Sequence, residues 1–548
     1  MLNGNAVMSH IAAAVVLLFV SLGLTGQPSV LPAAVRASAD TITAEQLKRD
    51  LDYFASDELM GRNTPSPGFD AAAEYISKRL EKAGVKPFGD AGTYLQRYQM
   101  REMRVDTDAA HLEVGGRRFT FGADFGLRSF AGPLSGTYPL VYVGHGWVVP
   151  DRNIDPYGSL DVRGKIVVAH GPRALPKGIE IRQIGRTTPG ASSPQEEAAR
   201  RGAAAVLFIP LSTALKNWEQ SRGNSVTRRE MEPPVPSAYA APRITSMLVS
   251  TAVTDVLLSD EQIAEPDIIK RGDAQDYHAS FLLKKTITVN IPAASDVLHR
   301  PYNVVGVIEG SDPLLRNEYI TIESHLDGAV GTRAVEGDPI YNSADDNASG
   351  SAGTLSIAER MMTAPRPKRS LIFIWDSGEE QGLWGTRYFV GNPPVPLQQI
   401  VAHFNIDMIG ANRAPGSADE KSLSVTRPRE VYLVGPGVLS SRTDALLTEV
   451  NAAYLNLKFN RDFDRPDHEF FYPRTDAGPF LERGILTIGF FTGIHPRYHQ
   501  PSDEARFLDP KKMEDITRTV FVSVWMLADS TQRPGIDKTI PSTVPRYR

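Results

Sequence analysis

The sequence predicts an α/β domain whose mixed, mostly parallel sheet is flanked by helices, with a second, β-rich unit inserted into it. From residue 303 onward, apolar runs of strand length alternate with helical patterns, as in parallel sheets connected through helices. Between residues 126 and 285 the sequence pattern changes to short Val/Ile/Tyr-rich runs separated by Gly, Pro and Asp. The chain has 548 residues, of which 41% are hydrophobic and 22% charged, so it can form more than one packed core.

The N-terminal segment is typical of an export signal. Residues 11–24 form an apolar run that is short for a bilayer span and suits the core of a signal peptide. The small residues Ala37 and Ala39 predict cleavage before Asp40, which makes residues 1–39 the signal peptide. No Lys or Arg precedes the run, which leaves an uncleaved anchor as the alternative. We expect an exported protein, periplasmic or secreted, with no stable membrane span after cleavage.

The insert divides the predicted α/β domain into two parts. Residues 40–125 form the first part, and apolar residues at helical spacing predict helices over 43–56 and 68–83. The insert spans 126–285 and includes a helical pattern at 195–202, so we expect it to be mixed rather than purely β. Residues 286–530 form the second part, and residues 531–548 a flexible tail. Strands and helices of the second part are expected near 303–310, 319–324, 348–362, 370–377, 401–407, 429–435, 484–491 and 510–530.

Composition excludes several classes of function. The net charge is −5, so no basic excess exists to bind a nucleic acid backbone, and we expect no nucleic acid partner. The chain contains no cysteine, which excludes disulfides, thiolate metal sites and cysteine nucleophiles. Any metal ion must therefore bind to His, Asp or Glu.

Acidic residues and histidines follow the predicted strands of the second part, at the sheet edge where ligands of α/β proteins gather. A single histidine there is usually structural, and an Asp-Asn pair before a helix is usually an N-cap. Five such sites at one edge indicate a shared function. They are His325 with Asp327, Asp345 with Asp346, the pair Glu379-Glu380, Asp407, and His499.

Two histidines and three carboxylates suit two zinc ions that share one bridging ligand. Two metals can hold both the attacking water and the carbonyl oxygen of an amide. Neighbouring residues that leave a strand point in different directions, so one carboxylate of Glu379-Glu380 can bind metal while the other accepts a proton. We expect the Asp327 carboxylate to accept the second ring N–H of His325.

These motifs together resemble metallopeptidase family twenty-eight, the co-catalytic zinc aminopeptidases. The resemblance extends to residues 51–87, and the insert resembles a protease-associated domain. It rests on five segments in the family's order: His325-Leu326-Asp327, Ala344 to Gly350 (ADDNASG), Glu379 to Thr386 (EEQGLWGT), Asn405 to Gly410 (NIDMIG) and Tyr498 to Asp503 (YHQPSD).

The resemblance implies a specific division of roles and two Zn²⁺ per chain. One zinc would bind His325 and Asp407, the other Glu380 and His499, and Asp346 would bridge them. Glu379 would be the general base of a water-mediated amide hydrolysis. Tyr498 would donate its hydroxyl to the developing oxyanion, with packing against the sheet edge as its alternative role.

The implied function is an exported aminopeptidase acting on peptides with a free N-terminus. The alternatives are a carboxypeptidase for acidic peptides, a glutaminyl cyclase, and a noncatalytic peptidase-like binding protein. The family often has Arg-Ser-Asp-His where this chain has Arg474 to Ala477 (RTDA), a change near the expected substrate pocket. Three further histidines, His145, His170 and His403, are interpreted as structural, and 185–193 as a candidate lid.

Overall fold

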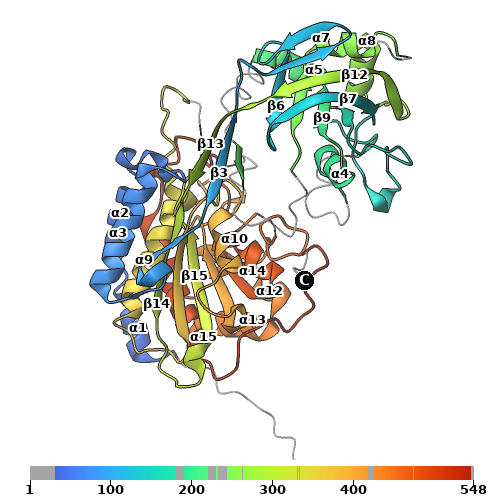
Figure 1. The fold of residues 1–548 in the computed structure, drawn as a ribbon. Helices are drawn as coiled ribbons and strands as arrows, with labels where there is room; N and C mark the ends of the chain where they lie inside the picture. The colour runs from blue at the N-terminus through green and yellow to red at the C-terminus, as the bar shows by residue number, and fades with distance from the viewer. Residues whose placement is uncertain are drawn as a thin grey trace, which may run out of the picture.

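The computed structural model describes residues 31–171, 173–179, 191–219, 230–232, 243–261, 263, 265–329, 331, 334–417, 424–472 and 474–544. The apolar run 11–24 lies outside these residues, as does most of the candidate lid. Within them, none of the helices is both long enough and apolar enough for a transmembrane span. The chain forms a catalytic unit and a second unit, which the strands β3 (Met100–Val105) and β13 (Ala293–His299) connect (Figure 1).

The catalytic unit is built on a nine-stranded mixed sheet with the order β1-β14-β16-β15-β17-β20-β18-β19, and β2 pairs with β14. Its central strands β16, β15, β17 and β20 are parallel, whereas β14 and β18 join them antiparallel. This confirms the predicted mixed sheet, whose parallel pairings lie mainly at its centre. The strands are β1 (Lys86–Pro87), β2 (Leu95–Arg97), β14 (Tyr302–Ile308), β15 (Tyr319–His325), β16 (Ser370–Asp376), β17 (Ile400–Ile406), β18 (Glu430–Val434), β19 (Lys458–Asn460) and β20 (Leu486–Phe491).

Helices cover both faces of this sheet because the central strands are apolar on both sides. On one face α9 packs on β15 and β17, and α15 packs on α1, α2, α9 and α13. On the other face α10 and α14 pack near β14, β17 and β20. The helices are α1 (Ala33–Asp40), α2 (Ala44–Phe54), α3 (Pro67–Ala83), α9 (Gly350–Met361), α10 (Trp384–Gly391), α12 (Pro436–Leu439), α13 (Ser441–Ala453), α14 (Ala477–Glu482) and α15 (Pro510–Asp529).

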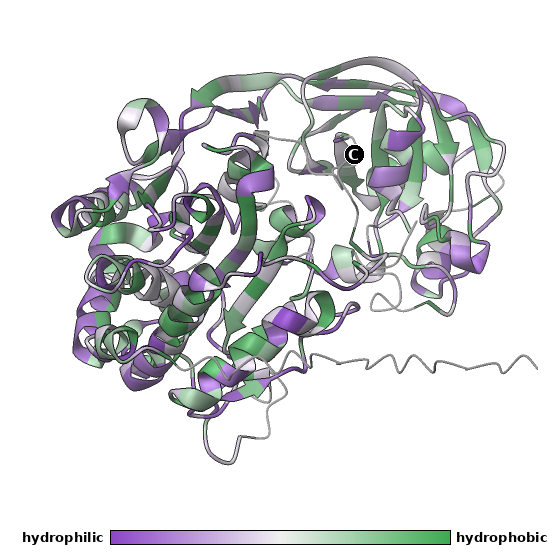
Figure 2. Ribbon diagram, turned by 90° about the horizontal axis from the view of Figure 1, so that it is seen from below, coloured by the Kyte–Doolittle hydropathy of each residue, from purple (hydrophilic) through white to green (hydrophobic). Residues whose placement is uncertain are grey.

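Local capping sets the ends of the predicted helices within a residue or two of their expected positions. Thr43 caps α2 by accepting from the backbone N–H of Gln46, and Ser66 caps α3 in the same way. Gly84 ends α3 in the left-handed region, with φ of 83°. Hydrophobic residues gather on the strands, whereas the outward faces of the helices carry most of the hydrophilic ones (Figure 2).

The second unit has its own eight-stranded sheet, with the order β5-β4-β12-β7-β8-β9-β11-β6, and its own buried core. The helices beside this sheet make it a mixed unit, as expected. Its elements are β4 (His111–Val114), β5 (Arg117–Thr120), β6 (Phe125–Ser129), β7 (Leu134–Tyr142), β8 (Ile166–His170), α4 (Pro194–Arg200), β9 (Ala205–Ile209), α5 (Ser212–Lys216), β11 (Ser246–Val249), α7 (Thr251–Leu258), α8 (Glu265–Asp273) and β12 (Phe281–Ile291).

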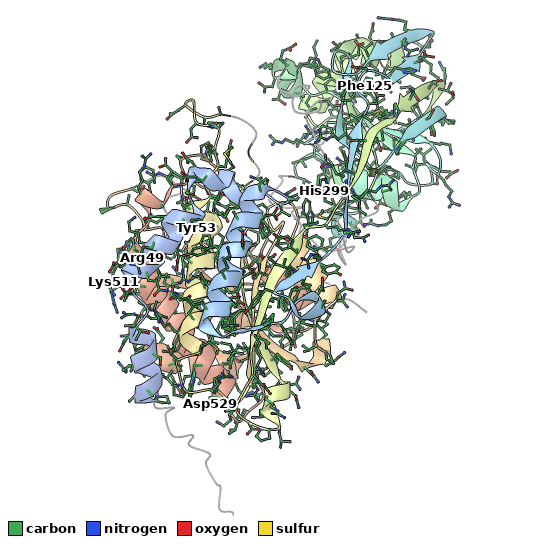
Figure 3. The ribbon with its side chains drawn as sticks, turned by 60° about the vertical axis from the view of Figure 1, so that its left-hand side comes forward. Arg49, Tyr53, Phe125, His299, Lys511 and Asp529 are labelled. Carbon is green, nitrogen blue, oxygen red and sulfur yellow. The ribbon has the colours of Figure 1, made fainter. Side chains whose placement is uncertain are left out.

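The boundaries of the insert differ from the predicted 126–285. Strands β4 and β5 precede residue 126 and pair with β12 and with each other, so the unit extends over about 111–291. β3 (Met100–Val105) and β13 (Ala293–His299) then pair as an antiparallel ribbon, to which β10 (Glu230–Glu232) adds a third strand. In Figure 3, His299 marks this ribbon and Phe125 the second unit.

The structure also differs from what we expected for the two ends of the chain. Ala37 and Ala39 lie within α1, where Val35 and Ala39 are fully buried, so the catalytic unit already includes residues upstream of the predicted boundary at Asp40. The predicted flexible tail is packed as far as Val544, which is buried. Asp537 in this tail accepts hydrogen bonds from the first backbone N–H groups of α13.

Candidate metal centre

Parallel pairing brings the predicted site residues to one edge of the sheet. β15 ends at His325, which lies opposite Asp376 at the end of β16. β17 ends one residue before Asp407, and β20 leads into the loop that contains His499. Because the carboxyl ends of parallel strands meet at one edge, residues distant in sequence become neighbours.

Two groups of side chains at this edge share Asp346. His325 Nε2 lies 3.2 Å from Asp346 Oδ1 and 3.5 Å from Asp407 Oδ1. His499 Nε2 lies 3.1 Å from Asp346 Oδ2 and 3.0 Å from Glu380 Oε2. Within each group the potential ligand atoms lie within 4.8 Å of one another. Asp346 therefore belongs to both three-residue groups, and each of its two oxygens faces one of them.

The donor atoms of both groups fit metal ions. His325 Nε2, Glu380 Oε1, Asp407 Oδ1 and His499 Nε2 are buried and have no hydrogen-bond partner among the described residues. Burial raises the pKa of Glu380 to about 8. Burial lowers the pKa of His499, but the nearby carboxylates of Asp346 and Glu380 outweigh this effect and raise the pKa to about 10. The carboxylates thus require positive charge nearby, which divalent cations would supply.

The second ring nitrogen of His325 fixes its orientation, although not through the expected partner. His325 Nδ1 lies 3.0 Å from the backbone carbonyl oxygen of Asp327, whereas its distance to the Asp327 carboxylate is 3.9 Å. The expectation that the carboxylate accepts this N–H is therefore wrong. A proton on Nδ1 leaves the Nε2 lone pair directed at Asp346 and Asp407, as a metal ligand requires.

The Asp327 carboxylate holds the Glu379-Glu380 loop instead. It accepts the backbone N–H of Glu379 at 3.1 Å and that of Glu380 at 3.3 Å. Both groups directly follow β16, where the chain turns away from the sheet. Asp327 thereby fixes the position of both glutamates relative to His325.

Asp346 is held by its own network below the site. It lies in the irregular segment Ala344–Ser349 rather than in the first turn of α9. Asp503 accepts the backbone N–H groups of Asp345 and Asp346 at 3.1 to 3.2 Å. The Asn347 side-chain oxygen accepts the N–H of Met408 at 3.2 Å, which ties this segment to the residue after Asp407.

Arg62 lies beneath the site, and sequence reasoning missed it. Its side chain is fully buried and donates to the carbonyl oxygens of Leu326, Asn342 and Ser343 at 2.9 to 3.0 Å. Burial lowers the pKa of Arg62 to about 10, and Asp327 is the strongest of the carboxylates that oppose this. The N-terminal segment thus brings a positive charge under the acidic cluster. The resemblance over 51–87 included Arg62, but its role depends on contacts with the other half of the chain.

Two further predicted site residues, Glu379 and Tyr498, lie next in sequence to members of the ligand groups, Glu380 and His499. Burial raises the pKa of the Glu379 carboxyl well above its usual value. Tyr498 stacks on His499, with ring centroids 3.7 Å apart. Arg474 Nη2 donates to the Tyr498 hydroxyl oxygen at 3.0 Å, which leaves the hydroxyl proton available for another acceptor.

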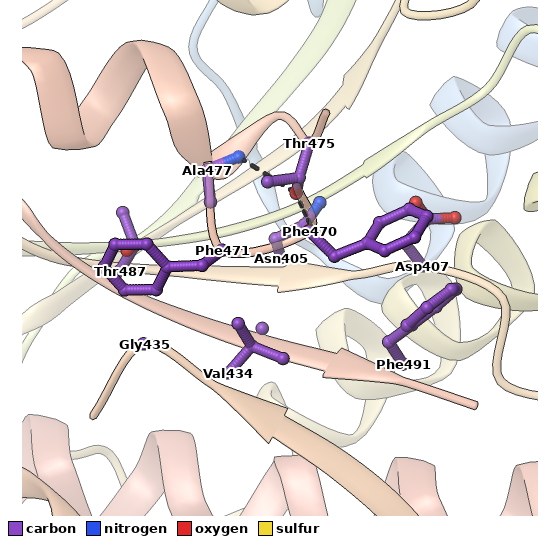
Figure 4. Close-up of a pocket in the computed structure, with 11 residues that line it drawn as sticks. Asn405, Asp407, Val434, Gly435, Phe470, Phe471, Thr475, Ala477, Thr487 and Phe491 are labelled. Carbon is purple, nitrogen blue, oxygen red and sulfur yellow. Dashed lines mark hydrogen bonds between the residues drawn. The ribbon is translucent and has the colours of Figure 1, made fainter. Parts of the chain in front are cut away.

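A pocket with apolar and polar lining residues adjoins Asp407 (Figure 4). Its apolar lining residues include Phe470, Phe491, Val434 and Ala477. Ala477 is the position where a histidine was expected from the resemblance, so the change does lie at a pocket. The small side chain leaves room there for an apolar group.

The histidines interpreted as structural have protein partners in the structure. His403 is buried on β17, stacks on Phe480 at 3.7 Å and lies 2.9 Å from the Thr321 hydroxyl. His170 is buried on β8, with Nε2 3.0 Å from the Tyr142 hydroxyl. His145 Nδ1 accepts the backbone N–H of Trp147 at 3.0 Å.

Comparisons with known proteins agree with this geometry. Residues 303–524 match the profile of the family described as Peptidase family M28. An aminopeptidase of Pseudomonas aeruginosa is 24% identical over 480 residues, which is 86% of this chain and 73% of that protein. Leupeptin-inactivating enzyme 1 of Streptomyces exfoliatus is 30% identical over 255 residues, 42% of this chain and 50% of that protein. The fold is similar to that of an aminopeptidase from Aneurinibacillus sp. strain AM-1, with a TM-score of 0.53, 18% identity, and coverage of 94% of this chain and 100% of that one.

Proposed function

Residues 303–524 belong to peptidase family M28, and from this premise we propose that the protein is an exported, zinc-dependent aminopeptidase that removes N-terminal residues from peptides. The observation that supports it best is that two three-residue groups of potential ligands share Asp346. No nucleic acid partner is proposed, and the identification of the second unit as a protease-associated domain stays a prediction.

His325, Asp346 and Asp407 would hold one zinc ion, and Asp346, Glu380 and His499 the other. When bound, such ions lower the pKa of a water molecule and polarise a carbonyl group. His325 is suited to this role because Nδ1 lies within hydrogen-bond distance of a backbone carbonyl, which orients the Nε2 lone pair toward the other ligands.

Glu379 would act as the general base and then as the general acid. It adjoins Glu380 but belongs to neither of the two ligand groups, so its carboxylate remains available for proton transfer. It would accept a proton from the attacking water and pass this proton to the leaving amine. Tyr498 would donate its hydroxyl proton to the oxyanion that forms on the scissile carbonyl, since Arg474 already donates to its oxygen.

The pocket beside Asp407 would take the side chain of the N-terminal residue. Its phenylalanine and valine lining favours apolar residues over charged ones. Arg474 is the basic group that a carboxypeptidase could use for a substrate carboxylate. It donates to Tyr498 at 3.0 Å and to Glu469 at 3.3 Å, so these bonds oppose that use and favour the aminopeptidase.

The test is hydrolysis of aminoacyl amides by the zinc-loaded protein, with each substrate offered free and N-acetylated. We expect cleavage of the free-amine substrates alone, fastest for apolar residues. Glu379→Gln should bind the same amount of zinc and lose activity by about a thousandfold, within the range of general-base catalysis. Faster cleavage of N-acetylated peptides from their C-terminus would identify a carboxypeptidase, and unaltered activity of the variant would refute the role of Glu379.

A further inference from the structure

A second group of acidic side chains lies inside the sheet, away from the groups that share Asp346. It consists of Glu323 on β15, Asp376 at the end of β16 and Asp476 in the residue before α14, and we call it the carboxylate triad. All three side chains are buried, with exposed fractions of 0%, 0% and 1%. Their potential ligand atoms lie within 4.8 Å of one another.

The triad has too few hydrogen-bond donors for three carboxylates. Asn405 Nδ2 donates to Glu323 Oε2 at 2.8 Å. The Thr386 hydroxyl lies against both Asp376 and Asp476, but it has one proton and can donate to one of them. One oxygen each of Glu323, Asp376 and Asp476 is buried without any hydrogen-bond partner among the described residues.

The negative charges of other buried carboxylates are stabilised by backbone N–H donors or arginine side chains. Asp327 and Asp503 each accept backbone N–H groups, and Arg62 lies close to both. Asp50, far from the site, also has one unpartnered buried oxygen, but its other oxygen lies 2.8 Å from the Arg79 guanidinium.

The triad has neither a backbone N–H donor nor an Arg or Lys partner among the described residues. His403 Nε2 lies 3.7 Å from Glu323 Oε2, but burial lowers the pKa of His403 to about 3, so this histidine supplies no positive charge near neutral pH. Three adjacent buried charges without compensation would be very costly.

We propose that the carboxylate triad binds a third, structural cation, of the hard divalent class that prefers carboxylate oxygens, such as Ca²⁺ or Mg²⁺. Three carboxylates supply up to six oxygens, and Ca²⁺ takes about six to eight oxygen ligands while Mg²⁺ takes an octahedral set. The three unpartnered oxygens would become ligands, and the negative charge would be compensated.

The position of this cation gives it a structural role. Glu323 lies two residues before His325, and Asp376 lies three residues before Glu379. Asp476 belongs to the loop that also contains Arg474, the partner of Tyr498. A cation here would tie together three segments that bear site residues.

The burial of the triad predicts different exchange behaviour for the two kinds of site. The His499 side chain is 38% exposed, so a chelator should reach the two proposed zinc ions in the folded protein. The triad is closed, so its cation should leave only when the protein unfolds. The experiment is elemental analysis of the full chain as purified, after dialysis against EDTA, and after unfolding in EDTA.

We expect three metal equivalents as purified, one hard cation after dialysis, and none after unfolding. Glu323→Gln and Asp476→Asn should lose only the retained equivalent, whereas the matched control Asp50→Asn should keep it. His499→Ala should lower the zinc count and leave the retained cation in place, which separates this inference from the proposed function.

The proposal is overturned if the purified protein retains no cation after dialysis. In that case protons shared among the three carboxyl groups neutralise the triad. Retention of the cation by both Glu323→Gln and Asp476→Asn would also overturn it, because the ion would then lie elsewhere. Should the two variants not fold, the wild-type count before and after dialysis still decides the question.

Discussion

Asp327→Asn tests the role that the structure gives to this carboxylate. Asp327 accepts the backbone N–H groups of both Glu379 and Glu380, with one oxygen for each. Asparagine keeps one acceptor and turns an NH₂ group toward the other N–H, so one hydrogen bond to a charged group is lost. Such a bond contributes about 1.5 to 3 kcal/mol. If this energy holds the loop in its reactive position, kcat should fall by about ten- to a hundredfold.

The assay is steady-state hydrolysis of an aminoacyl amide, with zinc content measured on the same samples. We expect kcat to fall while KM and zinc content stay near their wild-type values, because the backbone carbonyl that faces His325 Nδ1 is unchanged. Asp312→Asn is the matched control: Asp312 also accepts two backbone N–H groups, those of Leu314 and Leu315, in an exposed turn. Loss of zinc from Asp327→Asn, with normal kcat for the zinc-loaded fraction, would refute the reasoning and restore a role in orienting His325.

Three further predictions follow from contacts in both units. Arg474→Met removes the bond to the Tyr498 hydroxyl and should lower kcat by about tenfold with little change in KM, measured with a free-amine substrate; an equal loss with Arg474→Lys would argue against a hydrogen-bonding role. Ala477→Phe should fill part of the pocket and shift preference toward small N-terminal residues by about tenfold or more, read as the ratio of kcat/KM for alanyl and leucyl amides; an unchanged ratio would place the specificity pocket elsewhere. Burial lowers the pKa of His145 and of His170 from 6.5 to about 4, so between these values the unfolded chain binds protons that the folded chain does not. Stability of the second unit should therefore fall as pH decreases through this window, by up to about 3 kcal/mol for each histidine, and His170→Gln should weaken the pH dependence of thermal unfolding.

The fold class and the residues of the site were predictable because their signals are local. Buried parallel strands appear as short apolar runs, and helices as patterns with caps such as Thr43 and Ser66. The side chains that follow those runs must meet at one sheet edge. That rule predicts that His325, Asp407 and His499 lie close together.

Other features depend on partners that are far apart in the sequence, and local patterns contain no information about them. β4 belongs to the second unit because it pairs with β12, more than 160 residues later, and β5 belongs to it because it pairs with β4, so the boundary at 126 was placed too late. The end at 531 was misplaced because Asp537 binds the start of α13. In both cases long-range hydrogen bonds, not composition, decide where a unit begins or ends.

The sequence by itself determined the peptidase-like fold, the absence of thiolate chemistry and the set of residues that gather at the sheet edge. Only the tertiary structure decided which groups these residues contact. The backbone carbonyl of Asp327 faces His325, whereas the Asp327 carboxylate accepts the N–H groups of Glu379 and Glu380. The tertiary structure also places Arg62 under the acidic cluster and brings the three residues of the carboxylate triad together. The reason is that hydrogen bonds and charge compensation act over about 3 to 4 Å in space, so they depend on which segments the fold brings side by side.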